Sequence, residues 1–305
     1  MSKRELDAAG IVDPATRASY ERCRALNAQH GKTYYLATQL LPAAKRPYVH
    51  ALYGFARYAD EIVDDLGSTL SAQEKSDWLG WWGERVLTDL AKGESDDTIG
   101  RALVDTVQRW AIPTAHFEAF LHSMRMDLTV TEYATFDDLY EYVYGSAAVI
   151  GLQMVPILEP IDDAAYPAAT DLGVAFQLAN FVRDVGEDLE RGRVYLPMED
   201  LRRFGLSRTH LETRQVTQAV RDLLAFEIAR VRRLSLRADP GIASLDPTSR
   251  PCIEAAQELY VGIVDEVEDI DFQVFDVRAT TSTARRARVA AAAYGRGLIA
   301  RRHPR

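Results

Sequence analysis

The stretch NFVRDVGEDLERGRVYLP, residues 180–197, places many charged side chains directly after an apolar helical segment. Asp184 and Asp188 stand four residues apart, and Asn180 stands four residues before Asp184. On an α-helix this spacing brings the three side chains to one face. An isolated acidic run is usually a solvated helix face held by salt bridges. Whether this one is a binding site therefore depends on the rest of the chain.

A second acidic helix repeats the pattern upstream, in YGFARYADEIVDD, residues 53–65. Asp60 and Asp64 share a helix face, where like charges cost roughly a few tenths of a kcal/mol unless a cation lies between them. Apolar residues surround both acidic sets, so the carboxylates are expected to face a cleft with apolar walls. Two such helices favour one shared site over two solvated faces.

Buried carboxylates need cationic partners. Without them, burial costs roughly several kcal/mol per group or forces protonation. Mg²⁺ is the best candidate, because it binds one or two carboxylates and completes its octahedron with waters and phosphate oxygens. The two acidic helices therefore predict Mg²⁺, with Mn²⁺ as the alternative ion, and a diphosphate ligand that completes the site.

Basic residues stand close to the acidic ones. Arg57 and Arg183 each lie within three residues of an acidic pair, and a guanidinium group binds phosphate through two parallel hydrogen bonds. Lys32 precedes Thr33 at an expected helix start, where free backbone N–H groups attract an anion. The GxxxxGK[ST] and GxGxxG patterns of nucleotide-binding loops are absent from the sequence, so a nucleotide site of either kind has little support.

Helical periodicity recurs along most of the chain and alternating strand patterns are nearly absent, which predicts an all-α fold. No linker is long enough to mark a domain boundary, and no internal repeat is found. We expect one helical domain over residues 1–305, with a flexible segment at residues 1–18 and a basic C-terminal helix and tail at residues 281–305. The expected helices, roughly ten in number, span residues 33–41, 46–65, 71–91, 97–110, 114–130, 136–155, 166–190, 212–237, 247–275 and 281–301.

The composition, with 47% apolar and 27% charged residues in 305, is that of a soluble globular protein. The net charge of −9 argues against nucleic acid as a partner, because a phosphate-binding surface is usually basic. Cys23 and Cys252 lie far apart without a CxxC pair, which indicates a reducing compartment and a cytoplasmic location. The N-terminus lacks the apolar core of a secretory signal, and the longest nearly apolar run, residues 145–158, is too short to span a bilayer.

The C-terminal segment differs in charge from the rest of the chain. Residues 277–305 contain eight Arg and no acidic residue. Such an Ala- and Arg-rich helix is either a solvated terminal helix or a helix that contacts an anionic membrane surface. The second alternative would place the protein peripherally on the inner face of a membrane.

The sequence resembles the squalene/phytoene synthase family, whose members join two prenyl diphosphates head to head. The resemblance covers nearly the whole chain, from GKTYYLATQLLP through ALYGFARYADEIVDD, SMRMDL and RDVGEDLERGRVYLP to YVGIVDEVEDIDFQVFDVRA. The SMRMDL and RDVGEDLERGRVYLP stretches are most similar to bacterial phytoene synthases. One departure is the family's Ser-Lys-Ser-Phe, which reads Gly31-Lys32-Thr33-Tyr34 here. Because Thr33 keeps a hydroxyl, we expect a changed flap near the first substrate rather than a lost function.

The resemblance implies an isoprenoid synthase fold, in which helices surround a central apolar cavity. Mg²⁺ ions would draw electron density from the leaving diphosphates, and fixed positive side chains would assist them. The implied metal ligands are Asp60, Asp64, Asn180, Asp184 and Asp188. The implied substrate-binding residues are Lys32, Thr33, Arg57, Arg183, Gly151, Tyr260 and Arg278, and the implied catalytic residues are Asp60, Asp64, Asp184, Asp188, Tyr53, Tyr142 and Tyr195.

The implied reaction condenses two geranylgeranyl diphosphates to phytoene through prephytoene diphosphate, a step of carotenoid biosynthesis. It ends in proton loss, so no NADPH is expected, whereas squalene formation in this family uses NADPH hydride. The aromatic faces of Tyr53, Tyr142 and Tyr195 would stabilise the carbocation by roughly 0.5–2 kcal/mol each. Gly151 lies in the apolar segment 147–158, which resembles the wall of the channel for the prenyl tail.

Two alternatives remain at this point. The same chemistry on farnesyl diphosphate would give squalene, dehydrosqualene or hydroxysqualene. A non-catalytic assembly factor of the same fold is the other alternative, although such a protein would be expected to have lost carboxylates that are complete here. The expected partners are prenyl diphosphate substrates, a membrane surface and downstream carotenoid enzymes.

Overall fold

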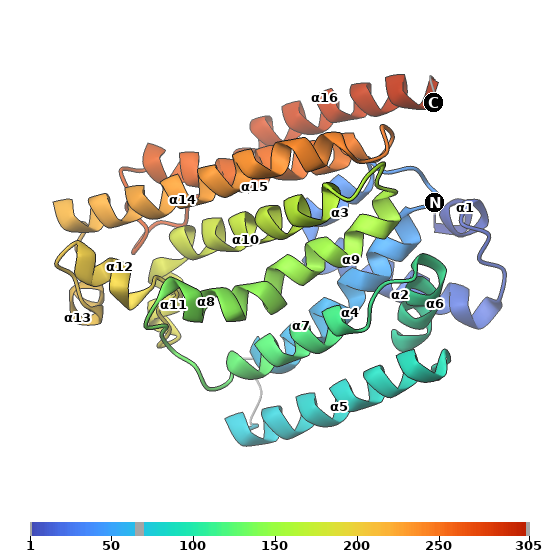
Figure 1. Ribbon diagram of the computed structural model, residues 1–305, viewed down its shortest axis with the longest axis horizontal. Coiled ribbons are helices and arrows are strands. Elements are labelled where there is room, and N and C mark those ends of the chain that lie inside the picture. The colour runs from blue at the N-terminus through green and yellow to red at the C-terminus, as the bar shows by residue number, and fades with distance from the viewer. Residues whose placement is uncertain (1, 65–69, 303–305) are drawn as a thin grey trace.

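The computed structural model describes residues 2–64 and 70–302, and the regular structure within them is helical (Figure 1). Strand pairing there is limited to two isolated bridges, Glu132 with Val194 and Pro160 with Leu245. The prediction of an all-α fold is confirmed. The helices are α1 (Ser2–Ala8), α2 (Pro14–His30), α3 (Lys32–Thr38), α4 (Arg46–Asp64), α5 (Ala72–Lys92), α6 (Gly100–Trp110), α7 (Ala115–Met126), α8 (Phe136–Val143), the π-helical turn η1 (Tyr144–Ala148), α9 (Val149–Leu158), α10 (Ala165–Arg183), α11 (Val185–Glu190), α12 (Met198–Arg203), α13 (Arg208–Glu212), α14 (Gln218–Ala243), α15 (Arg250–Asp269) and α16 (Thr283–Arg302).

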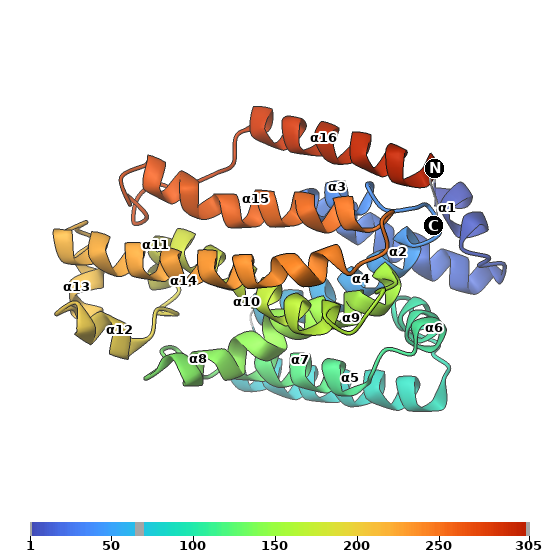
Figure 2. The ribbon, with the colours of Figure 1, turned by 45° about the horizontal axis from the view of Figure 1, so that its top comes forward.

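Helix α10 lies at the centre of the bundle. It packs along α14 and also contacts α15, α9 and η1. Its buried residues include Ala168, Leu172, Val174 and Phe181, and they point to more than one side, as expected for a helix inside a protein core. Figure 2 shows the outer layer on one side of the bundle, where α16 lies on α15. The expectation of one domain over the whole chain stays a prediction.

The N-terminal segment is folded, in contrast to the flexible segment expected for residues 1–18. The Asp13 carboxylate caps α2 by accepting a hydrogen bond from the Thr16 N–H (2.8 Å), which satisfies a donor that the helix leaves unpaired. Leu6 and Ile11 are only 3% and 6% exposed and belong to the main hydrophobic cluster. The sequence expectation was wrong because a seven-residue helix such as α1 is too short to show a clear periodicity.

The expected helix over residues 136–155 is a continuous helical rod, α8–η1–α9, with an irregular middle. A π-turn changes the backbone hydrogen bonding, and here the Ser123 hydroxyl donates to the Tyr142 carbonyl (2.8 Å) just before the turn. Gly145 is required inside η1, because a Cβ there would lie 2.2 Å from the Ala119 carbonyl oxygen. Single π-turns are often found at functional sites, and this one forms part of the cavities described below.

This rod, Phe136–Leu158, is the one helix among the described residues that is long and apolar enough to cross a membrane by length and composition. Its most apolar window has a mean hydropathy of 1.2, and 61% of that window is buried inside the protein. A buried core helix passes the same test, so the length and composition of this rod are weak evidence for a membrane span.

The expected helix over residues 166–190 is interrupted at Asp184. This residue ends α10 and precedes α11, with φ −98° and ψ 13°. The interruption coincides with a close approach of another segment, since a Cβ at Gly186 would lie 2.4 Å from the Phe275 carbonyl oxygen. The Asp188 N–H still donates to the Asp184 carbonyl (2.8 Å). The four-residue spacing of the acids is therefore kept while the chain changes direction.

Helices α1, α2, α12 and α13 were not predicted, and the two long helices α14 and α15 differ from their expected bounds. The helix expected at residues 212–237 is α14, which begins at Gln218 because the Thr217 hydroxyl caps it by accepting from the Val220 N–H (3.3 Å). The helix continues past Pro240, which lies near its C-terminal end, and ends at Ala243.

A buried ionic cluster joins α12 to α14. The Arg230 guanidinium donates to Asp200 (2.9 Å) and to Glu227 (2.5 Å), and it lies 4.3 Å from the ring centroid of Phe136 on α8. The Glu227 side chain is nearly inaccessible, and burial raises its pKa to about 8. The cluster therefore ties α8, α12 and α14 together.

Candidate active site

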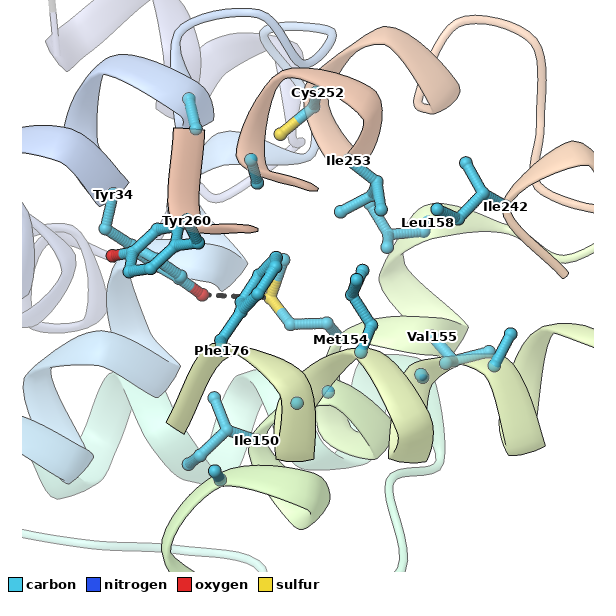
Figure 3. A pocket seen from close by; sticks show the side chains of 18 of the residues that line it. Tyr34, Ile150, Met154, Val155, Leu158, Phe176, Ile242, Cys252, Ile253 and Tyr260 are labelled. Carbon is cyan, nitrogen blue, oxygen red and sulfur yellow. Dashed lines mark hydrogen bonds between the residues drawn. The ribbon is translucent and has the colours of Figure 1, made fainter. Parts of the chain in front are cut away.

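Two adjoining cavities lie between the central helices. One has a volume of about 420 Å³ and is lined largely by charged and polar residues. The other, shown in Figure 3, has a volume of about 280 Å³ and is lined mainly by apolar residues. Four residues line both, so the two cavities adjoin at these side chains: Ser146, Ile150, Gln177 and Asn180.

The acidic residues predicted from the sequence meet at the polar cavity. Asp60 comes from α4, while Asp184 and Asp188 come from the joint between α10 and α11 and from α11 itself. Asn180, from the last turns of α10, lines the same cavity. Asp64 is the last residue of α4, and its side chain lies outside the described residues. The structure thus brings the two distant acidic stretches together in space.

Both predicted arginines pair with the acids. The Arg57 guanidinium donates to the Asp60 carboxylate (2.5 Å) and to Glu61 (3.2 Å). The Arg183 Nε donates to the Asp184 Oδ1 (2.6 Å), and its Nη2 donates to the other carboxylate oxygen. Each acid therefore already has a cationic neighbour, which lowers the repulsion that the sequence spacing would otherwise impose.

Among the acids of the polar cavity, Asp188 has a strongly raised pKa. Burial, and after it the nearby Asp184 carboxylate, raise this pKa to about 7, while Arg191 and Arg193 act in the opposite direction. A divalent cation would remove this penalty by favouring the ionised form. Residues 2–64 and 70–302 contain no cluster of three or more His, Cys, Asp or Glu side chains that could hold a metal on its own. The oxygen-rich wall therefore fits Mg²⁺ only together with further oxygens, such as those of a diphosphate.

Arg278 reaches the same acids from the segment that follows α15. Its guanidinium donates to both oxygens of Glu187 (2.9 and 3.0 Å) and to the Asp184 Oδ2 (3.3 Å). Its side chain is 49% exposed, so it stands at the rim of the site. This contact places Arg278 beside the predicted metal ligand Asp184, while its role in substrate binding stays a prediction; its partner Glu187 was not predicted.

An aromatic wall covers one side of the polar cavity. The rings of Phe181 and Tyr195 are stacked with centroids 4.2 Å apart, and Tyr142 lies 5.6 Å from Tyr195. Burial raises the pKa of Tyr142 and of Tyr195, so both hydroxyls are neutral at physiological pH. Tyr53 lines the cavity from α4, and burial raises its pKa to about 12. Together with Phe181, these rings form an aromatic part of the cavity wall next to the acids.

Asp127 and Arg193 form part of the site and were not predicted. The Asp127 carboxylate accepts from the Tyr195 hydroxyl (2.6 Å) and from the Arg193 guanidinium (3.3 Å). Arg193 also donates to the Asp127 backbone carbonyl (2.7 Å). Asp127 is 8% exposed, and both residues line the polar cavity. Only the fold brings these two positions together, so their spacing in the sequence gave no signal.

The apolar cavity extends from the shared residues between α3, α9, α10 and α15. The Tyr34 hydroxyl donates to the Met154 sulfur (3.2 Å), and the Phe176 and Tyr260 rings stack with centroids 4.7 Å apart (Figure 3). Tyr260 thus belongs to the wall of the apolar cavity. The remaining side chains labelled in Figure 3 are also apolar or weakly polar: Ile150, Val155, Leu158, Ile242, Cys252 and Ile253.

Small residues give the apolar cavity its room. Gly151 lines it and packs against α10, where a Cβ would lie 2.5 Å from the Ala169 carbonyl oxygen. Ala147 also lines the cavity. Ala148 belongs to the same apolar segment but is fully buried toward Gly173, and it does not line the cavity. The sequence identified the correct segment without resolving which of its faces is turned to the cavity.

Three predicted residues do not line the described cavities: Lys32, Thr33 and Arg278, the last of which stands at the rim. Lys32 and Thr33 begin α3, and the side chain of Lys32 is exposed. Tyr34, the next residue, does line the apolar cavity. The roles of Lys32 and Thr33 in substrate binding stay predictions.

Residues 27–286 match the family described as squalene/phytoene synthase. The chain belongs to this family. The phytoene synthase of Arthrospira platensis is 37% identical over 285 residues, which cover 88% of this chain and 91% of that protein. The 15-cis-phytoene synthase of Synechococcus elongatus is 37% identical over 280 residues, with 88% and 90% covered.

Solved structures agree with the family. A dehydrosqualene synthase, solved in complex with a ligand, superposes with a TM-score of 0.83 at 27% identity, covering 92% of this chain and 96% of that one. The squalene synthase of Alicyclobacillus acidocaldarius gives a TM-score of 0.79 at 25% identity, with 87% and 98% covered. The isoprenoid synthase fold is therefore confirmed. The family also makes this chain an enzyme of the prenyltransferase type.

Proposed function

We propose that this enzyme condenses two molecules of geranylgeranyl diphosphate head to head, through prephytoene diphosphate, to give phytoene for carotenoid biosynthesis. The observation that carries the proposal is a cavity lined by acids and arginines that adjoins an apolar cavity and shares four lining residues with it. One part suits a charged diphosphate and the other suits a long hydrocarbon tail. The relatives that are named phytoene synthase, at 37% identity over most of both chains, support this choice of substrate.

The acids and arginines of the polar cavity would change partners when a diphosphate binds. Arg57 and Arg183 now pair with Asp60 and Asp184. With Mg²⁺ and diphosphate present, these carboxylates would turn to the cation, which leaves the guanidinium forks to bind phosphate oxygens. When bound, Mg²⁺ would supply Lewis-acid polarisation of the diphosphate oxygens. The negative and positive charges of the site would therefore be balanced both before and after the substrate binds.

The aromatic wall would stabilise the positive charge that appears when the diphosphate leaves. The rings of Tyr142, Phe181 and Tyr195 stand next to the acids at the cavity wall, and a ring face attracts a cation. The neutral hydroxyl of Tyr195 is held by Asp127, so it is fixed and does not provide a free nucleophile. The closely packed apolar walls would keep water away from the cation, and the prenyl double bond of the second substrate would attack it.

The proposal includes Mg²⁺, with Mn²⁺ as a substitute, and no NADPH, because the final step is loss of a proton. We also propose that the enzyme works in the cytoplasm, peripherally on the inner face of the membrane, where downstream carotenoid enzymes would take up the product. The plant relatives, such as that of Narcissus pseudonarcissus, are named chloroplastic. Cys23 and Cys252 are free and buried, which suits a reducing compartment.

The test is an incubation of the purified enzyme with geranylgeranyl or farnesyl diphosphate and Mg²⁺, with and without NADPH, followed by mass spectrometry of the extracted hydrocarbons. We expect phytoene from geranylgeranyl diphosphate without any need for NADPH. Asp222→Asn, at an exposed position on α14, is the control for a carboxylate change outside the cavity. A hydrocarbon formed only from farnesyl diphosphate would overturn the assigned substrate.

A further inference from the structure

The outward side of α16 carries large apolar residues that no part of the described chain covers. Tyr294, Leu298 and Ile299 are 54%, 39% and 64% exposed. Their spacing of four and five residues brings them to one broad face of the helix. The opposite face packs on α15 through buried Val289 and Ala293. The helix therefore carries apolar residues on both its inner and its outer side.

Arginines accompany these apolar residues on the outer side. Arg302 stands three residues after Ile299, and Arg288 stands six residues before Tyr294, both with exposed side chains. Within residues 2–64 and 70–302, neither arginine has an ion-pair partner. In contrast, Arg285 pairs with Asp265 (3.0 Å) on α15. The outer side of α16 thus keeps its positive charge, although the whole chain has a net charge of −9.

Helix α16 is also close to the wall of the apolar cavity. It packs on α15, whose inner side lines that cavity with Cys252, Ala256 and Tyr260. Near its C-terminal end, the Arg301 guanidinium donates to the Leu40 carbonyl (2.8 Å), just after α3, and α3 forms another part of the cavity wall. Figures 1 and 2 both show α16 at the edge of the molecule, beside α15.

We propose that the outer side of α16 docks on the surface of an anionic lipid bilayer, with Tyr294, Leu298 and Ile299 in the headgroup region and Arg288 and Arg302 against lipid phosphates. Basic and apolar residues on one helix face are the combination that binds such an interface. In the docked enzyme, helices α16 and α15 lie between the bilayer and the apolar cavity. The inference rests on the proposed function only in that the product is a lipid.

The charge on this face favours a bilayer over a protein partner. Small residues, Ala291, Ala292 and Gly295, fill the middle of the outer side, so it is a shallow surface without a pocket for the anchor residues of a protein partner. Each arginine near an anionic surface strengthens membrane binding about fivefold. That contribution is lost on neutral lipid and at high salt.

The test measures flotation of the full-length protein with vesicles of phosphatidylcholine alone or mixed with phosphatidylglycerol. The variant Ile299→Ser/Arg302→Ala removes one apolar and one basic group three residues apart. Its matched control is Leu236→Ser/Arg233→Ala on α14, which has the same spacing and similar exposure, with Leu236 68% exposed. Thermal melting of both variants checks that the fold is intact.

We expect the wild-type protein and the α14 control to float with anionic vesicles and not with neutral ones. The α16 variant should bind at least about tenfold more weakly. Wild-type protein that fails to float, equal binding of both vesicle types, or an α16 variant that binds like the control would each overturn the proposal. Phytoene production in detergent, measured in parallel, tests the proposed function separately, because flotation requires no turnover.

Discussion

The buried cluster of Asp200, Glu227 and Arg230 makes the stability of this fold depend on pH in a predictable direction. Burial raises the pKa of Glu227 from its ordinary 4.5 to about 8. A group whose pKa is raised in the folded state stabilises the fold fully below its unfolded pKa, and this contribution is lost as the pH rises through the folded pKa. The protein should therefore lose stability between about pH 4.5 and pH 8.

Glu227→Gln imitates the protonated acid and should remove this dependence. The amide keeps an oxygen for Arg230 and gains N–H donors for Asp200, so the hydrogen bonds of the cluster can persist. At about 1.36 kcal/mol per pH unit, the variant should exceed the wild type by about 4 kcal/mol at pH 8 and about 1 kcal/mol at pH 5. For a chain of 305 residues this corresponds to a Tm higher by about 6 °C and about 1 °C.

The assay is thermal unfolding of both proteins, followed by circular dichroism, at several pH values from 4 to 9. Glu258→Gln, at an exposed position on α15, is the matched control and should leave the difference near zero at every pH. A Glu227→Gln variant that is less stable than the wild type at pH 8 would refute the reasoning. So would a stability difference that does not change with pH, because it would show that Glu227 is ionised in the folded protein.

Asp184→Asn should lower turnover about a hundredfold or more with a small change in Tm, because it removes a carboxylate for the metal; normal turnover would contradict the metal assignment. Arg57→Lys should also lower turnover, since an ammonium group cannot offer the guanidinium fork proposed to bind phosphate oxygens, and an unchanged KM for the diphosphate would count against this role. Asp127→Asn should lower kcat by roughly ten- to a hundredfold, and Tyr195→Phe should match it if Asp127 acts by holding the Tyr195 hydroxyl. Chelation of divalent cations should stop the reaction, and added Mg²⁺ should restore it.

Local spacing predicted the parts of the site that lie close together in the sequence. Helical spacing of four residues is visible in the sequence itself. It identified Asp60 on α4 and the series Asn180, Asp184 and Asp188. The break at Asp184 was not visible, since its cause is the approach of Phe275, far along the chain. The expected and the observed helices therefore differ in continuity, while the positions of the acids agree.

Contacts between distant segments could not be predicted in the same way. Asp127 and Arg193 meet only because the segment after α7 lies beside the segment before α12, where Glu132 and Val194 form a bridge. The π-turn η1 was missed for a related reason: Gly145 is required by the carbonyl of Ala119 on α7, and no local pattern indicates such an approach.

The pairing of acids with arginines explains why the opening stretch could be mistaken for a solvated helix face. Arg183 and Arg278 neutralise Asp184 in the same way as a surface salt bridge would. The difference lies in Asp188, which is held among like charges and apolar walls with a pKa raised by burial. On a solvated helix face, water would screen the repulsion between such carboxylates. In this site the repulsion persists because apolar walls exclude water. A bound cation would offset the repulsion that destabilises the empty site, so the same residues that are costly in the free protein would strengthen binding of a metal and its diphosphate.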